Sequence, residues 1–246
     1  MTKKAQFWIG TSGWSYDDWK GKFYPEDCAK SHWLEYYTDE FNAVEVNATF
    51  YRSFPATTYT HWQEKAPDNF RYVIKLSRYI THRKYLLQVK TSIHRAEKSA
   101  NILKDKLGLI LMQLPPNMPY NLARLETAFA AFHDPSRLVV EFRDPKWLTD
   151  EVKELLIRYN VIFCNVDGPN SRINEWLTSN IAYIRLHGRK QLYKHNYTKA
   201  ELEEVAEHLQ NLVRKGAKEL YVFFNNDYDA HAANNAKTLK LLLDIH

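Results

Sequence analysis

Apolar residues gather in eight short runs along the 246-residue chain, and polar or amphipathic stretches separate them. Each run has about the length of a strand and is rich in β-branched or aromatic residues, as strands buried on both faces are. We therefore predict eight strands, at residues 7–11, 43–47, 70–76, 108–114, 138–142, 161–165, 181–186 and 220–225.

Helical periodicity fills most of the intervals between these runs. Apolar side chains three and four residues apart form stripes within 33–41, 89–107, 122–132 and 152–159. Thr198 and Glu201 fit a capping box, which predicts a helix from there to about Gly216. A last helix is predicted over 230–243, whereas the segment between the sixth and seventh strands is short and its helix is doubtful.

Strand and helix therefore alternate eight times, which favours parallel strands joined by right-handed crossovers. The predicted fold class is α/β: a single TIM-type (β/α)8 barrel, one domain over residues 1–246, with a short or irregular sixth βα unit. An open doubly wound sheet is the alternative, but no G-x-G-x-x-G motif follows a strand.

Composition narrows the class of protein. A net charge of +5 favours anionic partners, although many proteins carry such a charge without binding nucleic acid. The two cysteines, Cys28 and Cys164, are too few and too far apart for a disulfide framework. Residues 1–6 are polar and lack the apolar stretch of a signal peptide, and no run has membrane-spanning length. We expect a cytoplasmic protein without a membrane partner; its oligomeric state stays open.

The ends of the predicted strands are polar. Successive side chains of a strand point to opposite faces of the sheet, and this alternation predicts which residues face inward. Catalytic groups of barrels lie at the carboxyl ends of the strands, where the βα loops converge. The residues expected to form an inward polar ring there are Thr11, Glu45, Lys75, Gln113, Glu141, Asn165, Arg185 and Asn225.

Burying two carboxylates and two cations costs several kcal/mol for each group that lacks a partner. One interpretation is a neutral, self-satisfied network that closes the top of the barrel. The other is a functional site, which we favour because eight polar ends in register exceed what closure needs.

The chain also resembles a known family along nearly its whole length. The stretches that carry the resemblance include IGTSGWSY at 9–16, FNAVEVNATFYR at 41–52, QLPP at 113–116, VEFR at 140–143, RLHGR at 185–189 and FNND at 224–227. They are similar to the domain of unknown function 72 family, the YecE-like proteins. The resemblance implies a TIM-type barrel with a cleft at its C-terminal face, and it implies no reaction.

The candidate residues divide into two groups. The expected catalytic residues are Glu45, Lys75, Glu141 and His187. The expected substrate-binding residues are Trp14, Asn47, Tyr51, His82, Gln113, Arg143, Asp167, Arg185, Arg189, Tyr193, Asn225, Asn226 and Asp227.

Three kinds of chemistry fit this set poorly. A divalent metal on the carboxylates and His187 is disfavoured because Lys75 and Arg185 share the ring, so we expect no cofactor. A glycosidase pair of Glu45 and Glu141 meets the same objection, since nearby cations keep both carboxylates ionised. Lys75 is a candidate for a Schiff base, but Glu45 is expected to keep its amine protonated.

An anionic substrate would engage most of the candidate site residues, because arginine and lysine bind phosphate and histidine transfers protons near neutral pH. Our first hypothesis is a hydrolase-like enzyme for a phosphate-bearing substrate, nucleic acid among the candidates, with His187 or His82 as the acid–base group and Glu45 or Glu141 as a base. The alternatives are a non-catalytic binding protein for an anionic ligand or nucleic acid, and a carbohydrate-active enzyme that uses Glu45 and Glu141.

Overall fold

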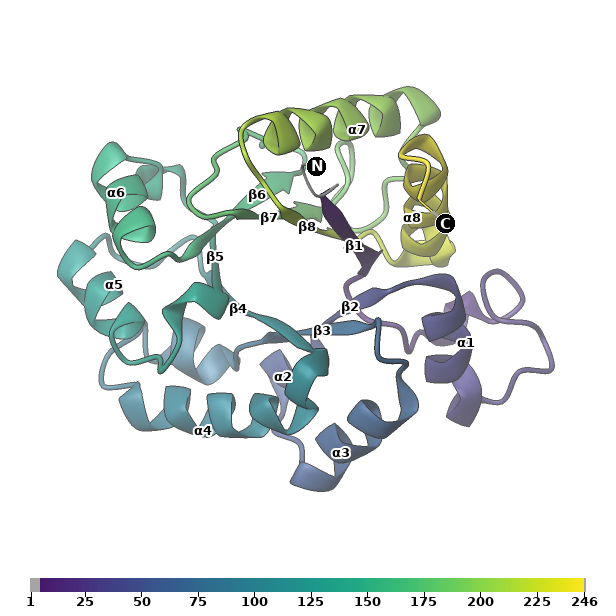
Figure 1. The fold of residues 1–246 in the computed structure, drawn as a ribbon, viewed down its shortest axis with the longest axis horizontal. Coiled ribbons are helices and arrows are strands. Elements are labelled where there is room, and N and C mark those ends of the chain that lie inside the picture. Colours follow the sequence, from purple (N-terminus) through teal and green to yellow (C-terminus); the bar gives the residue numbers. More distant parts are fainter. Residues whose placement is uncertain (1–4, 246) are drawn as a thin grey trace.

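The centre of the molecule is a closed ring of eight parallel strands, in which each strand pairs with its neighbours in sequence and β8 pairs with β1 (Figure 1). The computed structural model describes residues 5–245. All eight predicted strands are present. They are β1 (Gln6–Thr11), β2 (Ala43–Val46), β3 (Arg71–Lys75), β4 (Leu107–Leu114), β5 (Leu138–Phe142), β6 (Ile162–Asp167), β7 (Ile181–Leu186) and β8 (Glu219–Phe224).

Helices surround this ring on the outside (Figure 1). They are α1 (Trp33–Glu40), α2 (Ala48–Tyr51), α3 (Ala56–Lys65), α4 (Lys90–Ala100), α5 (Leu122–Phe129), α6 (Asp150–Arg158), α7 (Lys199–Arg214) and α8 (His231–Leu242). Residues 168–180, between β6 and β7, contain no helix, so the irregular sixth unit is confirmed. The TIM-type (β/α)8 barrel predicted from the alternation is therefore correct.

Local sequence explains how the helices begin and end. The capping box before α7 is present: the Thr198 hydroxyl accepts from the Glu201 amide, and the Glu201 carboxylate accepts from the Thr198 amide. Gly216 follows that helix with a φ of +110°, a conformation that side chains disfavour. The stripe predicted over 89–107 is split, because Lys104 has a φ of 52° and the helix gives way to a 3-10 segment (Asn101–Lys106).

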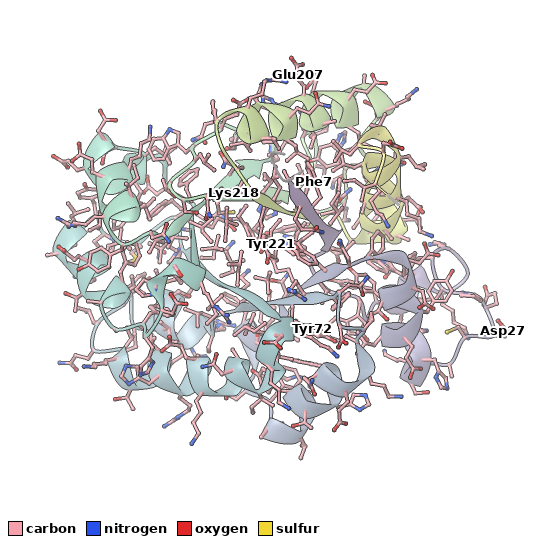
Figure 2. All side chains as sticks on the ribbon, viewed as in Figure 1. Phe7, Asp27, Tyr72, Glu207, Lys218 and Tyr221 are labelled. Carbon is pink, nitrogen blue, oxygen red and sulfur yellow. The ribbon has the colours of Figure 1, made fainter. Side chains whose placement is uncertain are left out.

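Two apolar cores lie on the two sides of the strand ring. The inner core draws residues from every strand, among them Trp8, Cys164 and Tyr221. The outer core packs strands against helices. Figure 2 shows the difference: Tyr221 lies at the strand ring, and Tyr72 lies toward α3, where its hydroxyl donates to the Trp62 carbonyl at 2.9 Å.

The predicted inward faces of β1 and β6 are wrong. Thr11 contacts the Tyr37 hydroxyl of α1 at 2.9 Å, and Asn165 donates to the Trp176 carbonyl at 3.0 Å, so both side chains lie outside the ring. Trp8 and Cys164 belong to the inner core instead. Strands buried on both faces show no polar side in their sequence, so nothing in these two runs determined which residues point inward.

Further expectations concern an export signal, membrane-spanning segments and the two cysteines. Residues 1–4, which open the polar stretch that we expected to lack an export signal, lie outside the described residues. Within residues 5–245, none of the helices combines the length and the apolar character that crossing a membrane requires. Both cysteines are free thiols, Cys164 buried and Cys28 partly so.

Candidate functional site

Arg185 of β7 is the centre of a buried ionic network at the carboxyl ends of the strands. Its side chain is fully buried, and its Nη2 donates to Glu45 Oε1 at 2.7 Å. Its Nη1 donates to Glu141 Oε2 on the other side. A guanidinium presents donors in a planar fork, so one arginine is able to hold carboxylates from two different strands.

Glu45 is held by more than this arginine. Its Oε1 accepts from the Ser12 hydroxyl at 2.8 Å, and its Oε2 accepts from the Tyr183 hydroxyl at 2.6 Å. Burial alone would raise the pKa of Glu45, but Arg185 and Lys75 lower it below its usual value. Ser12 was not among the predicted site residues, because the inward face predicted for β1 is the wrong one, and Tyr183 was not among them either.

Glu141 has a similar set of partners. Gln113 Nε2 donates to its Oε1 at 2.9 Å, and Arg143 and His187 approach the same oxygen. Burial would raise the pKa of Glu141, but Arg143 and Arg185 hold it well below its usual value. The two carboxylates are thus ionised acceptors, and neither supplies the protonated acid that a glycosidase pair needs.

His187 lies beneath the mouth rather than in it. The side chain of this residue is about 1% exposed, and its Nδ1 lies 2.9 Å from Asn225 Nδ2 while its Nε2 lies 3.2 Å from Arg143 Nη2. Burial, and then Arg185, lower the pKa of His187 to about 4, so the ring is neutral at pH 7. A buried ring with both nitrogens engaged is poorly placed to exchange protons with a substrate.

Lys75, the last residue of β3, differs from every other charged member of the ring. Within the described residues its Nζ has no hydrogen bond and no ion pair; its contact is with the face of Phe50, 4.5 Å from the ring centre. The residue is 7% exposed. Burial, and then Arg185, lower the pKa of Lys75 to about 7, although Glu45 and Glu141 act in the opposite direction.

This arrangement corrects the expectation that Glu45 keeps Lys75 protonated. Arg185, Ser12 and Tyr183 occupy the oxygens of Glu45, and no ion pair joins that carboxylate to Lys75. The carboxylate attraction is therefore weaker than the cost of burying the ammonium. The lowered pKa increases the neutral fraction of the Lys75 amine near pH 7, and a neutral lysine amine is able to act as a base or a nucleophile.

The short helix α2 determines the surroundings of Lys75. The Thr49 hydroxyl contacts the carbonyls of both Val46 and Lys75, at 2.8 and 2.7 Å, and so ties the ends of β2 and β3 together. The next residue, Phe50, is thereby placed against the Lys75 amine. Phe50 also contacts the ring of His82 edge to face, with the ring centres 4.9 Å apart.

His82 is the accessible histidine of this region. It is partly buried, and its Nδ1 lies 2.8 Å from the Thr81 hydroxyl. Among the described residues, its Nε2 has no hydrogen-bond partner. Burial, and then Lys75, lower the pKa of His82, so the imidazole is neutral and able to accept a proton at pH 7.

Several predicted binding residues lie apart from this network. Asp167 pairs with Arg189 at 3.0 Å and accepts from the Tyr197 hydroxyl at 2.9 Å, while Arg189 also pairs with Glu204. Asn226 donates to the His195 carbonyl at 2.8 Å. These contacts are the ones that hold loops and α7 in place.

The remaining predicted residues lie at the strand ends with different degrees of exposure. Asn47 donates to the Ser12 carbonyl at 3.2 Å, and Trp14 packs edge to face on Trp62. The Asp227 carbonyl accepts from the indole nitrogen of Trp19. Tyr51 is 69% exposed beside Phe50, and Tyr193 is 40% exposed with its ring edge to face on that of His187.

Metal-binding groups of suitable spacing occur elsewhere. Among residues 5–245, one histidine and acid group has ligand atoms within 4.8 Å of one another: His94, Glu97 and His133, in the helix layer. His133 Nδ1 lies 2.8 Å from a Glu97 oxygen, and His94 Nε2 lies 2.9 Å from the Ala131 carbonyl. At the mouth, by contrast, arginines occupy the carboxylates that a metal would need.

A hollow of about 1460 Å³ lies at the opposite end of the barrel from the ionic network. Its walls include Trp8, Arg71, Gly108, Lys218 and Tyr221. This hollow lies at the amino ends of the strands. In TIM-type barrels that end contributes to stability, and active sites lie at the opposite end. We place the candidate site at the mouth because the unpaired charge lies there.

Comparison with known proteins identifies the family. The profile of the protein family of unknown function DUF72 matches residues 8–246. The chain belongs to the DUF72 family. The UPF0759 protein YunF of Bacillus subtilis (strain 168) is 26% identical, with 97% of this chain and 95% of that protein aligned. The resemblance seen in the sequence motifs is thus confirmed.

Solved structures agree with this assignment. The crystal structure of a DUF72 family protein from Thermotoga maritima MSB8 has a TM-score of 0.86 and 30% identity, over 97% of this chain and 99% of that one. A DUF72 family protein from Enterococcus faecalis V583 has a TM-score of 0.84 at 21% identity, over 98% and 96%, and so shares the fold. Both names state a family and no reaction.

Proposed function

We propose that this DUF72 protein is an enzyme that acts on a small anionic, phosphate-bearing substrate at the mouth of the barrel, with Lys75 as the reacting group. The observation that carries the proposal is the unpaired amine of Lys75 within a ring whose other charges are matched. A buried charge without a partner costs free energy in the folded protein, and such groups concentrate at functional sites.

The charge balance supports an anionic substrate. Arg143 and Arg185 neutralise Glu45 and Glu141, so a protonated Lys75 leaves the ring with one positive charge in excess. An anion at the mouth would neutralise this excess charge. The attraction between the anion and the ring would be strong, because little water screens charges at a largely buried site.

Arg143 is the side chain best placed to hold the anionic group. Its Nε contacts Glu141 and its Nη2 contacts His187, while among the described residues Nη1 has no partner. The side chain is 23% exposed, so it is accessible from solvent where Arg185 is not. Arginine binds phosphate through paired donors, which suits this position.

The loops beside Lys75 add to the attraction. Residues 47–63 and 76–96 contain no aspartate or glutamate, and they carry the cations Arg52, Arg78, Arg83 and Lys84 near the ends of β2 and β3. A surface with one sign of charge raises the local concentration of oppositely charged ligands. The same charges would attract nucleic acid, but a buried amine is more accessible to a small molecule than to a phosphodiester chain.

Binding of inorganic phosphate tests the proposal. We expect calorimetry at low salt to detect phosphate binding to the wild type, and Arg143→Met and Lys75→Met to weaken it by about tenfold each. The advantage of the wild type over Lys75→Met should shrink as the pH rises from 6 to 9, because Lys75 loses its proton in this range. Lys98→Met on the outer surface of α4 is the matched control.

Three outcomes would contradict the proposal. The wild type fails to bind phosphate at low salt, both mouth variants bind as well as the wild type, or Lys98→Met weakens binding as strongly as they do. Tight, steeply salt-dependent binding of DNA oligonucleotides that is insensitive to Lys75→Met would favour the nucleic-acid alternative instead.

A further inference from the structure

The environment of Lys75 suits covalent chemistry as well as charge recognition. Within the described residues, no acceptor binds its Nζ, so the lone pair of the neutral amine is free. Phe50 covers one side of the amine, and Lys75 is only 7% exposed. A primary amine held in this way is a nucleophile toward carbonyl carbon.

We infer that Lys75 forms an imine with an aldehyde or ketone that also carries a phosphate or carboxylate group. The inference rests on the proposed function, because Arg143 would hold the anionic group while the carbonyl meets the amine. It adds to that function a substrate class, a carbonyl compound, and a covalent intermediate on a named residue.

The step balances without an oxidant or a reductant. The Nζ lone pair attacks the carbonyl carbon, the carbonyl π bond opens, and a proton moves from nitrogen to oxygen to give a carbinolamine. A proton from solvent then converts the hydroxyl to water, which leaves as the nitrogen lone pair forms the C=N bond of the iminium ion, and loss of the nitrogen proton to solvent gives the neutral imine. Addition of water reverses the sequence and regenerates the free amine.

His82 is positioned to handle the protons of these transfers. It contacts the same phenyl ring as Lys75, and its Nε2 has no partner among the described residues. Because His187 is buried with both nitrogens engaged, His82 is the histidine that shares this environment with the amine. Loss of His82 should slow imine formation more than it weakens phosphate binding.

Glu45 and Glu141 attract the protonated imine, and Arg185 and Arg143 oppose it. The iminium is a cation, and Glu45 and Glu141 both act electrostatically on the position of Nζ. The face of Phe50 carries the negative part of the ring quadrupole and attracts a cation above it. Glu45, Glu141 and the face of Phe50 thus offset part of the cost of burying a cation at this position.

Reductive trapping tests the inference. The full-length protein is incubated at pH 7 with glycolaldehyde phosphate or glyoxylate and sodium cyanoborohydride, and peptide mapping measures the secondary amine at each lysine. We expect Lys75 to be modified on the order of tenfold faster than Lys98, because exposed lysines are almost wholly protonated at this pH. Inorganic phosphate in excess should slow the reaction at Lys75 only.

Two variants keep the result decisive. Lys75→Arg retains the positive charge but forms no imine. Labelling of this variant should therefore be confined to the slow reaction of the surface lysines, while the protein still melts cooperatively. His82→Gln should trap severalfold more slowly than the wild type. The inference is wrong if the folded wild type is labelled at Lys75 no faster than at Lys98 with both carbonyl compounds.

The two proposals fail in different ways. If phosphate binding depends on Arg143 but no trapping occurs at Lys75, the imine is wrong and the anion site stands. If neither phosphate binding nor trapping occurs, both proposals fall together. Equal trapping of aldehydes with and without an anionic group would retain the reactive amine and reject the role of Arg143.

Discussion

Two buried lysines of this protein, at opposite ends of the barrel wall, have the same exposure and opposite surroundings. Lys75 and Lys106 are each 7% exposed. Lys106, just before β4, donates to the carbonyls of Gln63 and Ala66 at 2.6 and 2.5 Å, and it lies 3.7 Å from Asp68. Lys75 has no such partner within the described residues.

The difference separates a buried lysine that bonds to neighbouring carbonyls from one whose amine has no such partner among the described residues. Lys106 binds the carbonyls near the end of α3, which would otherwise lack donors, and so it joins a helix to the strand ring. The amine of Lys75 donates to no acceptor among the described residues. Burial of a charge therefore indicates a site only when the contacts around that charge are known.

The largest expected effect concerns the paired side of the ring. Glu141→Gln removes the charge that faces Arg185 and Arg143, so it should lower the free energy of unfolding by about 3–5 kcal/mol at pH 7. Chemical denaturation measures this loss. A variant as stable as the wild type would mean that the arginines do not depend on this carboxylate.

A smaller effect of opposite sign is expected at Lys75. Lys75→Met removes an unpaired charge and keeps the apolar stem against Phe50, so it should raise the free energy of unfolding by about 1–2 kcal/mol at pH 6.

This gain should disappear as the pH rises. The folded-state pKa of Lys75 is about 7 and its usual value is 10.5, so between these two values only the unfolded chain holds the proton. The stability contributed at Lys75 therefore increases with pH across this window and is absent below it. Melting curves at pH 6 and pH 9 compare the two proteins; a gain that is independent of pH would contradict the lowered pKa.

An effect of similar size but of opposite sign is expected at Lys106. Lys106→Met leaves two carbonyls without their donor and should lower the free energy of unfolding by about 1–2 kcal/mol. Denaturation of both variants under the same conditions should give changes of opposite sign. A gain in stability for Lys106→Met like that of Lys75→Met would show that the contacts of Lys106 do not stabilise the fold.

Much of the fold was predictable because its signals are local. Apolar runs of strand length and a capping box are readable from neighbouring residues, and both proved correct at β1 through β8 and at Thr198. The inward faces of β1 and β6 were not predictable, because a strand that is buried on both sides has no polar face to distinguish them. Ser12 was missed for this reason.

A barrel with charged residues at the carboxyl ends of its strands is readable from the sequence, because periodicity and residue type are properties of short segments. The pairing of those charges is visible only in the folded structure. Arg185 meets Glu45 across 140 positions of sequence, and Lys75 is left with the face of Phe50. Pairing depends on distances between strand ends, and those distances exist only once the ring has closed.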